Sequence, residues 1–327
     1  MNKFLVFIFF LSAFLIAFFA GSYWRGKFFV LQNENLINKI ISRPFDAYTI
    51  EKLSSKAYPS GKLNLNSDNS TFSFEFQPNP ESKSVKTTTG TITIPERTGK
   101  LPLVLMIRGY VDQEIYTPGI GTKHAAEVFN KNGYITIAPD FLGYAGSSPN
   151  AENVFESRFQ TYTTILSILN SLDQIEKWDG KNLFIWAHSN GGQIALTSLE
   201  ITRKSIPTTL WTPVSKPFPY NVLYYTDEAD DKGKLVRREL AKFEDIYDTD
   251  KYSIDNYYSN IVAPIQLHQG TVDDAVPVEW SRRLNKTLKA LDKDINYFEY
   301  SGSDHNLQPA WNTVIQRDLE FFRKNTK

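Results

Sequence analysis

A serine in the middle of the chain, Ser189, stands where it could act as a nucleophile. The apolar stretch Asn182–Ala187 predicts a strand that runs almost directly into this serine, and a glycine pair then opens a predicted helix. In a nucleophile elbow the serine sits on a sharp strand-to-helix turn, so the residues two before and two after it must be small. Ala187 and Gly191 fill these two positions, and Gly192 completes the glycine pair. The pattern predicts that Ser189 attacks a carbonyl carbon.

An elbow serine needs a base that takes its proton, and that base needs an acid that orients it. The partners are expected in the chain order serine, acid, histidine. His305 follows a predicted strand ending at Tyr300, so we expect it to be the base. His124, His188 and His268 fall on a predicted surface helix, within the elbow and inside a strand, where we expect structural roles.

The turn between Gly270 and Pro277 offers two adjacent carboxylates for the acid. We assign Asp273, because its spacing from Gly270 resembles the GTxD turn of such hydrolases. Asp274 is more typical of a residue that caps the next helix or bonds the turn backbone. Asp304, beside the histidine, is a third candidate.

The tetrahedral intermediate of acyl transfer carries an oxyanion that requires two aimed hydrogen-bond donors. One is the backbone N–H of Asn190, directly after the nucleophile, and the second is expected from the loop after the strand Leu101–Ile107. That loop begins with Arg108, Gly109 and Tyr110, and we assign the backbone N–H of Tyr110 to this role. Arg108 could alternatively pair with Asp112 or with a substrate carboxylate.

The elements that would position these residues alternate between strands and helices. A continuous apolar run such as Leu101–Ile107 is typical of a strand buried on both faces of a parallel sheet. The alternation predicts a mostly parallel central sheet with helices on both faces. Together with the elbow and the order of serine, acid and histidine, this predicts an α/β-hydrolase fold with a mostly parallel central sheet. An antiparallel hairpin is expected between Leu63 and Ile94. The further predicted strands are Tyr134–Ala138, Ile265–His268 and Ile295–Tyr300, and the predicted helices are Lys123–Asn132, Phe159–Leu172, Leu235–Phe243, Val278–Leu291 and Trp311–Phe322.

The first 27 residues are predicted to be a membrane anchor. Residues 4–20 carry no charge and one polar side chain, and they just reach the length that spans a bilayer. Tyr23 and Trp24 resemble an interfacial aromatic anchor. A cleaved signal peptide is the alternative, because Ala20 to Ser22 offers a cleavage site and would give a secreted protein. We expect an uncleaved anchor with the globular part outside the cytoplasm.

The remaining chain divides into a stalk and one catalytic domain. Residues 28–44 predict a stalk helix that Pro44 ends, and residues 45–327 form the predicted catalytic domain. Within it, residues from about 205 to 260 contain four prolines in their first part and then an acidic cluster. That composition favours a small cap insertion, although a solvated surface excursion is an equal alternative.

Composition excludes several functions. Lys plus Arg and Asp plus Glu balance at 36 each, which argues against a nucleic-acid partner. The chain has no cysteine, so thiol nucleophiles, disulfides and thiolate metal sites are excluded. Catalysis must then use an oxygen nucleophile, and we expect neither a metal nor an organic cofactor.

Several of these segments together resemble the catalytic domain of the prolyl oligopeptidase and acylaminoacyl peptidase family, over roughly residues 101–322. The segments are the Arg108–Tyr110 loop, the APDFLGYAGS stretch at 138–147, the elbow, the GTVDDAVP turn and the SGSDH loop. The resemblance implies cleavage of a short peptide or acyl derivative through an acyl-serine intermediate, without metal or cofactor. Arg108 departs from the family, which usually has histidine there. Shorter relatives are carboxylesterases, so ester cleavage is an alternative, and a hydrolase fold used only for binding is a third.

Overall fold

The structure of the protein is a computed structural model that describes residues 21–25, 27, 42–68 and 70–327. Contacts divide the chain into residues 1–44 and residues 45–327. The apolar run at 4–20 and most of the predicted stalk lie outside the described residues. In the part that is described, no helix is long and apolar enough to cross a membrane.

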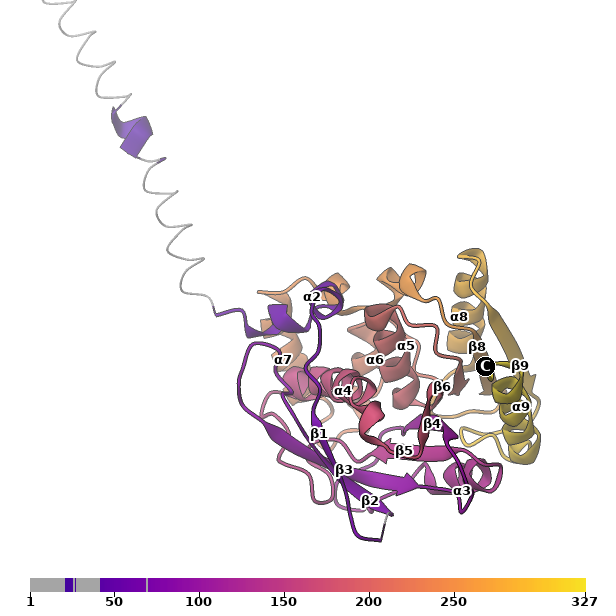
Figure 1. Ribbon diagram of the computed structural model, residues 1–327. Coiled ribbons are helices and arrows are strands. Elements are labelled where there is room, and N and C mark those ends of the chain that lie inside the picture. The colour runs from indigo at the N-terminus through magenta and orange to yellow at the C-terminus, as the bar shows by residue number, and fades with distance from the viewer. Residues whose placement is uncertain (1–20, 26, 28–41, 69) are drawn as a thin grey trace, which may run out of the picture. The chain divides into compact units, whose positions relative to one another are not determined.

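The domain from residue 45 is built around one mixed sheet of nine described strands (Figure 1). Their order across the sheet is β1-β2-β3-β5-β4-β6-β7-β8-β9. The first three strands pair antiparallel, β3 also pairs antiparallel with β5, and all pairs from β5 to β9 are parallel. The strands are β1 (Lys62–Leu65), β2 (Thr71–Phe76), β3 (Lys86–Thr93), β4 (Leu101–Ile107), β5 (Ile135–Pro139), β6 (Trp178–His188), β7 (Thr208–Trp211), β8 (Ile265–Gly270) and β9 (Ile295–Tyr300).

Helices follow most of the parallel strands, because each crossover between parallel strands must span a dozen or more residues and usually does so with a helix. The α-helices are α2 (Ile50–Ser55), α3 (Lys123–Lys131), α4 (Val154–Leu169), α5 (Asn190–Thr202), α6 (Tyr220–Leu223), α7 (Lys234–Glu244), α8 (Val278–Ala290) and α9 (Trp311–Lys324). The 3-10 turns are η1 (Pro44–Tyr48), η2 (Leu172–Gln174), η3 (Thr226–Glu228), η4 (Thr249–Tyr252), η5 (Ile254–Asn256) and η6 (Tyr258–Asn260).

Alternate side chains of the central strands pack into two different cores. In β4, Leu103 and Leu105 join the larger core with residues of α4, α5 and α8, whereas Val104 and Met106 join a second core with residues of α3 and α9. Successive side chains of a strand point to opposite faces, so a strand covered by helices on both faces must be apolar throughout. The predicted layering of helices on both faces of the sheet is therefore confirmed.

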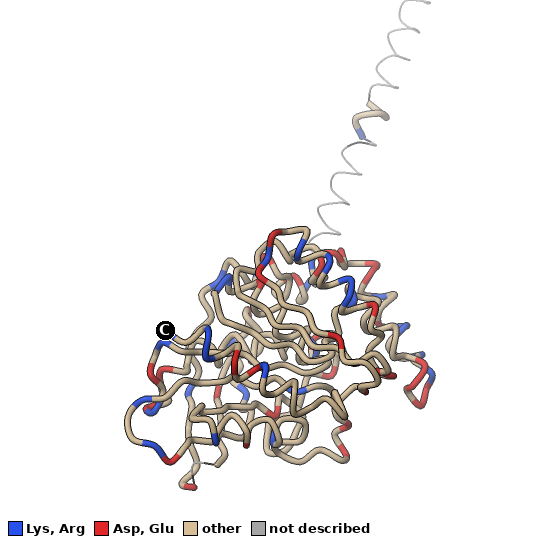
Figure 2. Tube along the Cα trace, turned by 90° about the vertical axis from the view of Figure 1, so that its right-hand side faces the viewer, with Lys and Arg blue, Asp and Glu red and all other residues tan. Residues whose placement is uncertain are grey.

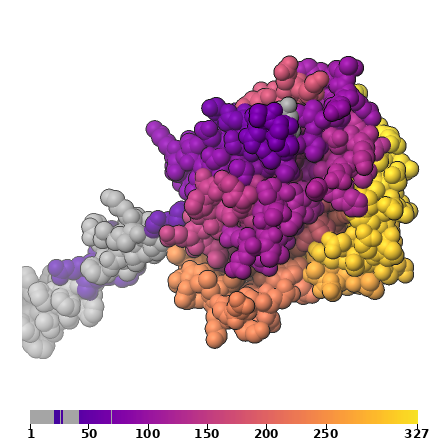
Figure 3. All heavy atoms as spheres, turned by 90° about the horizontal axis from the view of Figure 1, so that it is seen from below, coloured from indigo at the N-terminus to yellow at the C-terminus, as the bar shows by residue number. Residues whose placement is uncertain are grey.

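The predicted strands and helices are found with small shifts at their ends. The largest shift is in α4, which begins at Val154 because the Asn153 side chain accepts hydrogen bonds from the Phe155 and Glu156 backbone and caps the helix there. The predicted hairpin is also present, and β1 extends it to three strands. In Figure 3, the later part of the chain, coloured orange to yellow, lies along the lower and right-hand edges of the face shown.

The predicted cap insertion at 205–260 needs one correction. Its first residues form β7, a fully buried strand between β6 and β8 in the sheet. This strand has only four residues and begins with two threonines, Thr208 and Thr209, so it lacks the apolar run that marks the other parallel strands. Short helices and turns, including α6 and α7, make up the rest of the segment.

Figure 2 shows acidic and basic residues interspersed over the described domain.

Candidate active site

The turn between β6 and α5 holds Ser189 in a backbone conformation that non-glycine residues seldom adopt. Its φ is 54° and its ψ is −122°. A Cβ on Gly191 would lie 2.1 Å from the carbonyl oxygen of Ile107, and one on Gly192 would lie 2.4 Å from Cβ of Pro213. Both positions therefore require glycine, because Ile107 and Pro213 approach them too closely for a side chain. The elbow geometry thus follows from the residue types at these positions.

His305 and Asp273, which are 32 residues apart, meet beyond the carboxyl ends of β8 and β9. His305 Nδ1 lies 3.0 Å from each of the two Asp273 carboxylate oxygens. Because a carboxylate only accepts, Nδ1 carries the proton and leaves Nε2 free to accept another. The arrangement holds the imidazole in the tautomer that a general base requires.

The Asp273 carboxylate is shielded from solvent and receives further hydrogen bonds. Its oxygens accept from Gln269 Nε2 at 2.9 Å and from the backbone N–H groups of Ala275 and Val276 at 2.9 and 2.8 Å. Burial raises the pKa of Asp273, but the hydrogen bond and charge of His305 and the two backbone donors lower it more, so the net pKa is below the ordinary value. This carboxyl is therefore ionised at neutral pH.

The other two candidate acids lie elsewhere. Asp274 is exposed. Asp304 accepts from the backbone N–H groups of Asn306 and Gln308, both at 2.9 Å, and so shapes the loop that carries His305. Of the three carboxylates considered from the sequence, Asp273 is the one that contacts the imidazole.

Ser189 and the loop of His305 are tied to the same strand ends. The Ser189 backbone N–H donates to Trp211 at the end of β7, and Thr212, the next residue, donates from its hydroxyl to the His305 carbonyl at 3.0 Å. Between the described side chains of Ser189 and His305 there is no direct hydrogen bond. Such bonds are often long before substrate binds, and they shorten in the reacting complex.

The loop after β4 passes directly over the serine. A Cβ on Gly109 would lie 2.9 Å from Cβ of Ser189. This contact puts the backbone of the next residue, Tyr110, beside the elbow, and Asn190 begins α5 immediately after Ser189. The first N–H groups of a helix have no partners within it. The two residues assigned from the sequence to the oxyanion are thus chain neighbours of groups at the elbow: Tyr110 follows Gly109, which approaches Ser189, and Asn190 follows Ser189 itself.

Arg108 is buried beneath this loop and does not pair with Asp112. It donates to the carbonyl oxygens of Gly109 at 2.8 Å and Asp140 at 2.6 Å. Its guanidinium lies 4.1 Å from the centroid of the Tyr144 ring and 4.5 Å from that of Tyr116. Asp112 instead accepts from the Tyr110 hydroxyl at 2.8 Å. Arg108 thus lies in an aromatic cage formed by Tyr116 and Tyr144, and it holds the loop through its hydrogen bonds to the two carbonyl oxygens.

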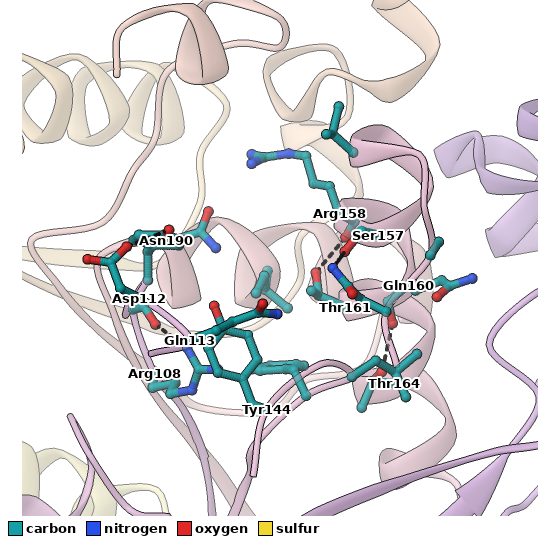
Figure 4. A pocket seen from close by; sticks show the side chains of 18 of the residues that line it. Arg108, Asp112, Gln113, Tyr144, Ser157, Arg158, Gln160, Thr161, Thr164 and Asn190 are labelled. Carbon is teal, nitrogen blue, oxygen red and sulfur yellow. Dashed lines mark hydrogen bonds between the residues drawn. The ribbon is translucent and has the colours of Figure 1, made fainter. Parts of the chain in front are cut away.

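A pocket of about 880 Å³ opens beside the elbow. Figure 4 shows Asn190 on one wall, Arg108 and Tyr144 below, and Ser157 and Thr161 of α4 on the opposite wall. The buried part of the lining combines apolar side chains with the polar side chains of Arg108, Gln160 and Thr164, and the exposed part carries carboxylates. The apolar lining includes Phe141, Leu142, Tyr162 and Ile194, and the exposed carboxylates are Asp112, Glu114, Glu152, Glu228 and Asp230.

The remaining histidines have partners of their own. His268 is buried between Tyr300 and Asp318, with ring nitrogens 2.8 and 3.0 Å from their oxygens. His124 stacks on Trp311 at 3.8 Å between ring centroids. His188 contacts His305, which the sequence did not indicate. Among the described residues, no group of three or more histidine and carboxylate side chains could hold a metal ion.

The family model described as "Prolyl oligopeptidase family" matches residues 121–327, which is more than half of the chain. The chain belongs to the prolyl oligopeptidase family. The match includes the elbow, the Asp273 turn and the His305 loop, whereas the Arg108–Tyr110 loop lies before it. Membership in the prolyl oligopeptidase family confirms the serine hydrolase that the sequence predicted.

One relative is "Uncharacterized peptidase YtmA" of Bacillus subtilis, which is 23% identical to this chain; the alignment covers 72% of this chain and 88% of the relative. Solved structures similar to this prolyl oligopeptidase family member include the acetyl xylan esterase of Paenibacillus sp. R4, with a TM-score of 0.59, 14% identity, and coverage of 83% of this chain and 91% of that one. Another is the acylaminoacyl peptidase of Pyrococcus horikoshii, with a TM-score of 0.56, 16% identity, and coverage of 81% and 42%. A third is Est1E of Butyrivibrio proteoclasticus with bound ferulic acid, with a TM-score of 0.55, 18% identity, and coverage of 73% and 95%. These likenesses show the α/β-hydrolase fold.

Proposed function

We propose that Ser189, His305 and Asp273 form the catalytic triad of a peptidase that cleaves short peptides or acyl derivatives. The hydrogen bonds between His305 Nδ1 and the shielded Asp273 carboxylate, at the strand ends where the elbow also lies, carry this proposal. Ser189 Oγ attacks the scissile carbonyl while His305 Nε2 takes its proton. His305 then gives that proton to the leaving group. In the second half of the reaction, His305 takes a proton from a water molecule that attacks the acyl-serine, and returns it to Ser189 Oγ as the acid product leaves.

The backbone N–H groups of Asn190 and Tyr110 are proposed to stabilise the oxyanion of both tetrahedral intermediates. The close approach of Gly109, which precedes Tyr110, to Ser189 supports this role, as does the place of Asn190 at the start of α5, since oxyanion donors must be fixed before the charge develops. The adjoining pocket supports a bulky acyl group, because apolar side chains form part of its buried lining and its volume suits a drug-sized molecule.

Cleavage of esters is the second candidate. The acetyl xylan esterase and Est1E match over 91% and 95% of their own lengths, whereas the acylaminoacyl peptidase matches over 42% of its length. The chemistry of the triad serves both reactions, but an amide requires protonation of a poor amine leaving group. Matched amide and ester substrates with the same acyl group separate the two: turnover of the ester alone would favour the esterase.

Ser189→Ala tests the nucleophile. Labelling by a fluorophosphonate probe and turnover of every substrate should both be lost, with the melting temperature unchanged. A Ser205→Ala variant, which changes a serine of a connecting loop, is the control and should label as the wild type does. Persistent labelling of the Ser189→Ala variant would place the nucleophile elsewhere.

We also propose that the first 27 residues anchor the protein in a membrane, with the catalytic domain outside the cytoplasm. The uncharged run at 4–20 and the aromatic pair at Tyr23 and Trp24 support it. The full chain should sediment with membranes, and a chain lacking residues 1–27 should not. Recovery of a secreted chain that starts near residue 23 would support a cleaved signal peptide instead.

A further inference from the structure

His188, the last residue of β6, makes a direct contact with the proposed base. Its ring lies 4.7 Å from the ring of His305 between centroids, at an interplanar angle of 43°. Its Nε2 lies 3.0 Å from the backbone carbonyl oxygen of His305. A carbonyl oxygen can only accept, so Nε2 of His188 is the protonated nitrogen and donates this hydrogen bond.

The same carbonyl accepts a second hydrogen bond, from the Thr212 hydroxyl at 3.0 Å. Thr212 follows β7, and its own backbone N–H donates to His268 in β8 at 2.8 Å. Two neighbouring strand ends of the sheet therefore hold the main chain of His305, while Asp273 holds its ring. Together these contacts restrain both the position and the rotation of the imidazole.

Burial sets the protonation state of His188. Burial and the neighbouring His305 lower the pKa of His188 to about 4, although the His305 carbonyl and the charges of Asp273 and Asp304 act in the opposite direction. At neutral pH His188 is therefore uncharged and carries one proton. A neutral neighbour does not oppose the positive charge that His305 acquires when it takes the proton of Ser189.

We propose that His188 is a positioning residue that holds His305 in line with Ser189 through its hydrogen bond to the His305 backbone and its packing against the imidazole. The inference rests on the proposed function of Ser189 and His305. This role also explains why a histidine stands directly before Ser189 in the elbow, since His188 contacts the loop that carries His305 from there. His188 does not line the large pocket, so its effect is expected on turnover and not on substrate affinity.

The test compares His188→Leu with His188→Gln in the full chain. The amide nitrogen of glutamine can stand near the position of Nε2 and donate to the same carbonyl, whereas leucine fills space without a donor. With an activated ester, kcat should fall about 100-fold in His188→Leu, because a misplacement of about 1 Å can cost that much. In His188→Gln most of this loss should be recovered, and KM should stay within about twofold in both variants. The rate of fluorophosphonate labelling should follow kcat.

Unchanged kcat in His188→Leu, or an equal loss in both variants, would overturn the inference. If His188→Leu does not fold, His188→Phe takes its place, because phenylalanine keeps a ring against the imidazole but has no donor for the carbonyl, and it should lower kcat about tenfold with KM unchanged. An unchanged kcat in His188→Phe would then overturn the inference. Ser189→Ala separates this inference from the proposed function, because an active Ser189→Ala variant refutes the function itself. An inactive Ser189→Ala variant beside a fully active His188→Leu variant refutes the positioning role alone.

Discussion

The guanidinium of Arg108 donates to the backbone carbonyl of Asp140 at 2.6 Å and so joins the end of β4 to the end of β5. The same side chain donates to the Gly109 carbonyl at 2.8 Å, in the loop that touches Ser189. A cation in an aromatic cage thus fixes the loop that carries Tyr110. Its burial leaves it little freedom to move toward a substrate carboxylate.

Arg108→Met should lower kcat/KM about 100-fold, the typical effect of losing one oxyanion donor. Methionine fills the aromatic cage but cannot donate to the two carbonyls, so the N–H of Tyr110 loses its fixed position. Steady-state kinetics with one activated ester measures the change. Arg323→Met, at the exposed end of α9, is the control and should keep wild-type activity. Wild-type kcat/KM in Arg108→Met would mean that the loop holds its shape without this support.

Asp273→Asn should lower kcat by about 10⁴-fold at neutral pH, because an amide at this position lets the imidazole adopt the wrong tautomer. Asp274→Asn is the matched control, since its side chain is the exposed neighbour in the same turn. It should change kcat less than about threefold, as is usual for a surface substitution away from the reacting groups. A comparable loss in both variants would mean that the wrong carboxylate has been assigned.

Glu200→Gln should raise stability, by an amount that grows with pH. Glu200 lies on α5 with no exposed surface and no hydrogen-bond partner for either carboxylate oxygen, and burial raises its pKa well above the ordinary value. A folded pKa above the unfolded one means that the folded chain binds more protons, so the free energy of unfolding falls as pH rises from about 4.3 toward the folded pKa. The Gln variant has no such proton to lose.

Urea unfolding at several pH values measures this difference, which should increase by about 1.4 kcal/mol per pH unit in that range. Glu244→Gln, at an exposed position on α7, controls for the loss of one negative charge. Curves for Glu200→Gln and wild type that stay parallel from pH 5 to pH 8 would show that Glu200 is ionised in the folded protein.

Asp318→Leu should destabilise the fold by about 3 kcal/mol or more. The buried Asp318 carboxylate on α9 accepts from Thr209 and Trp211 of β7 and from Gln266 and His268 of β8, at 2.6 to 3.0 Å. Leucine leaves these four donors buried without an acceptor.

Chemical denaturation measures the loss in Asp318→Leu. The exposed Glu320→Ala on the same helix should change stability by less than about 0.5 kcal/mol. An equal midpoint for Asp318→Leu and wild type would contradict the role of this carboxylate in joining α9 to the sheet.

The sequence alone determined the strands and helices, and the features of the site that depend on residues close together in the chain. The elbow at Ser189 is readable because its backbone strain demands small residues at fixed spacing, and the strand Leu101–Ile107 is readable because burial on both faces demands an unbroken apolar run. The order of Ser189, Asp273 and His305 followed from the same local signals. Membership in the family bears out the hydrolase that this order indicated.

The tertiary structure alone decided the features that depend on partners far away in the chain. β7 is a sheet strand because Thr209 and Trp211 find the Asp318 carboxylate more than 100 residues later, which no local pattern reveals. The same holds for the cage around Arg108 and for the contact between His188 and His305. A polar side chain is stable in the interior only when its partners meet it there, and those partners are brought together by the fold.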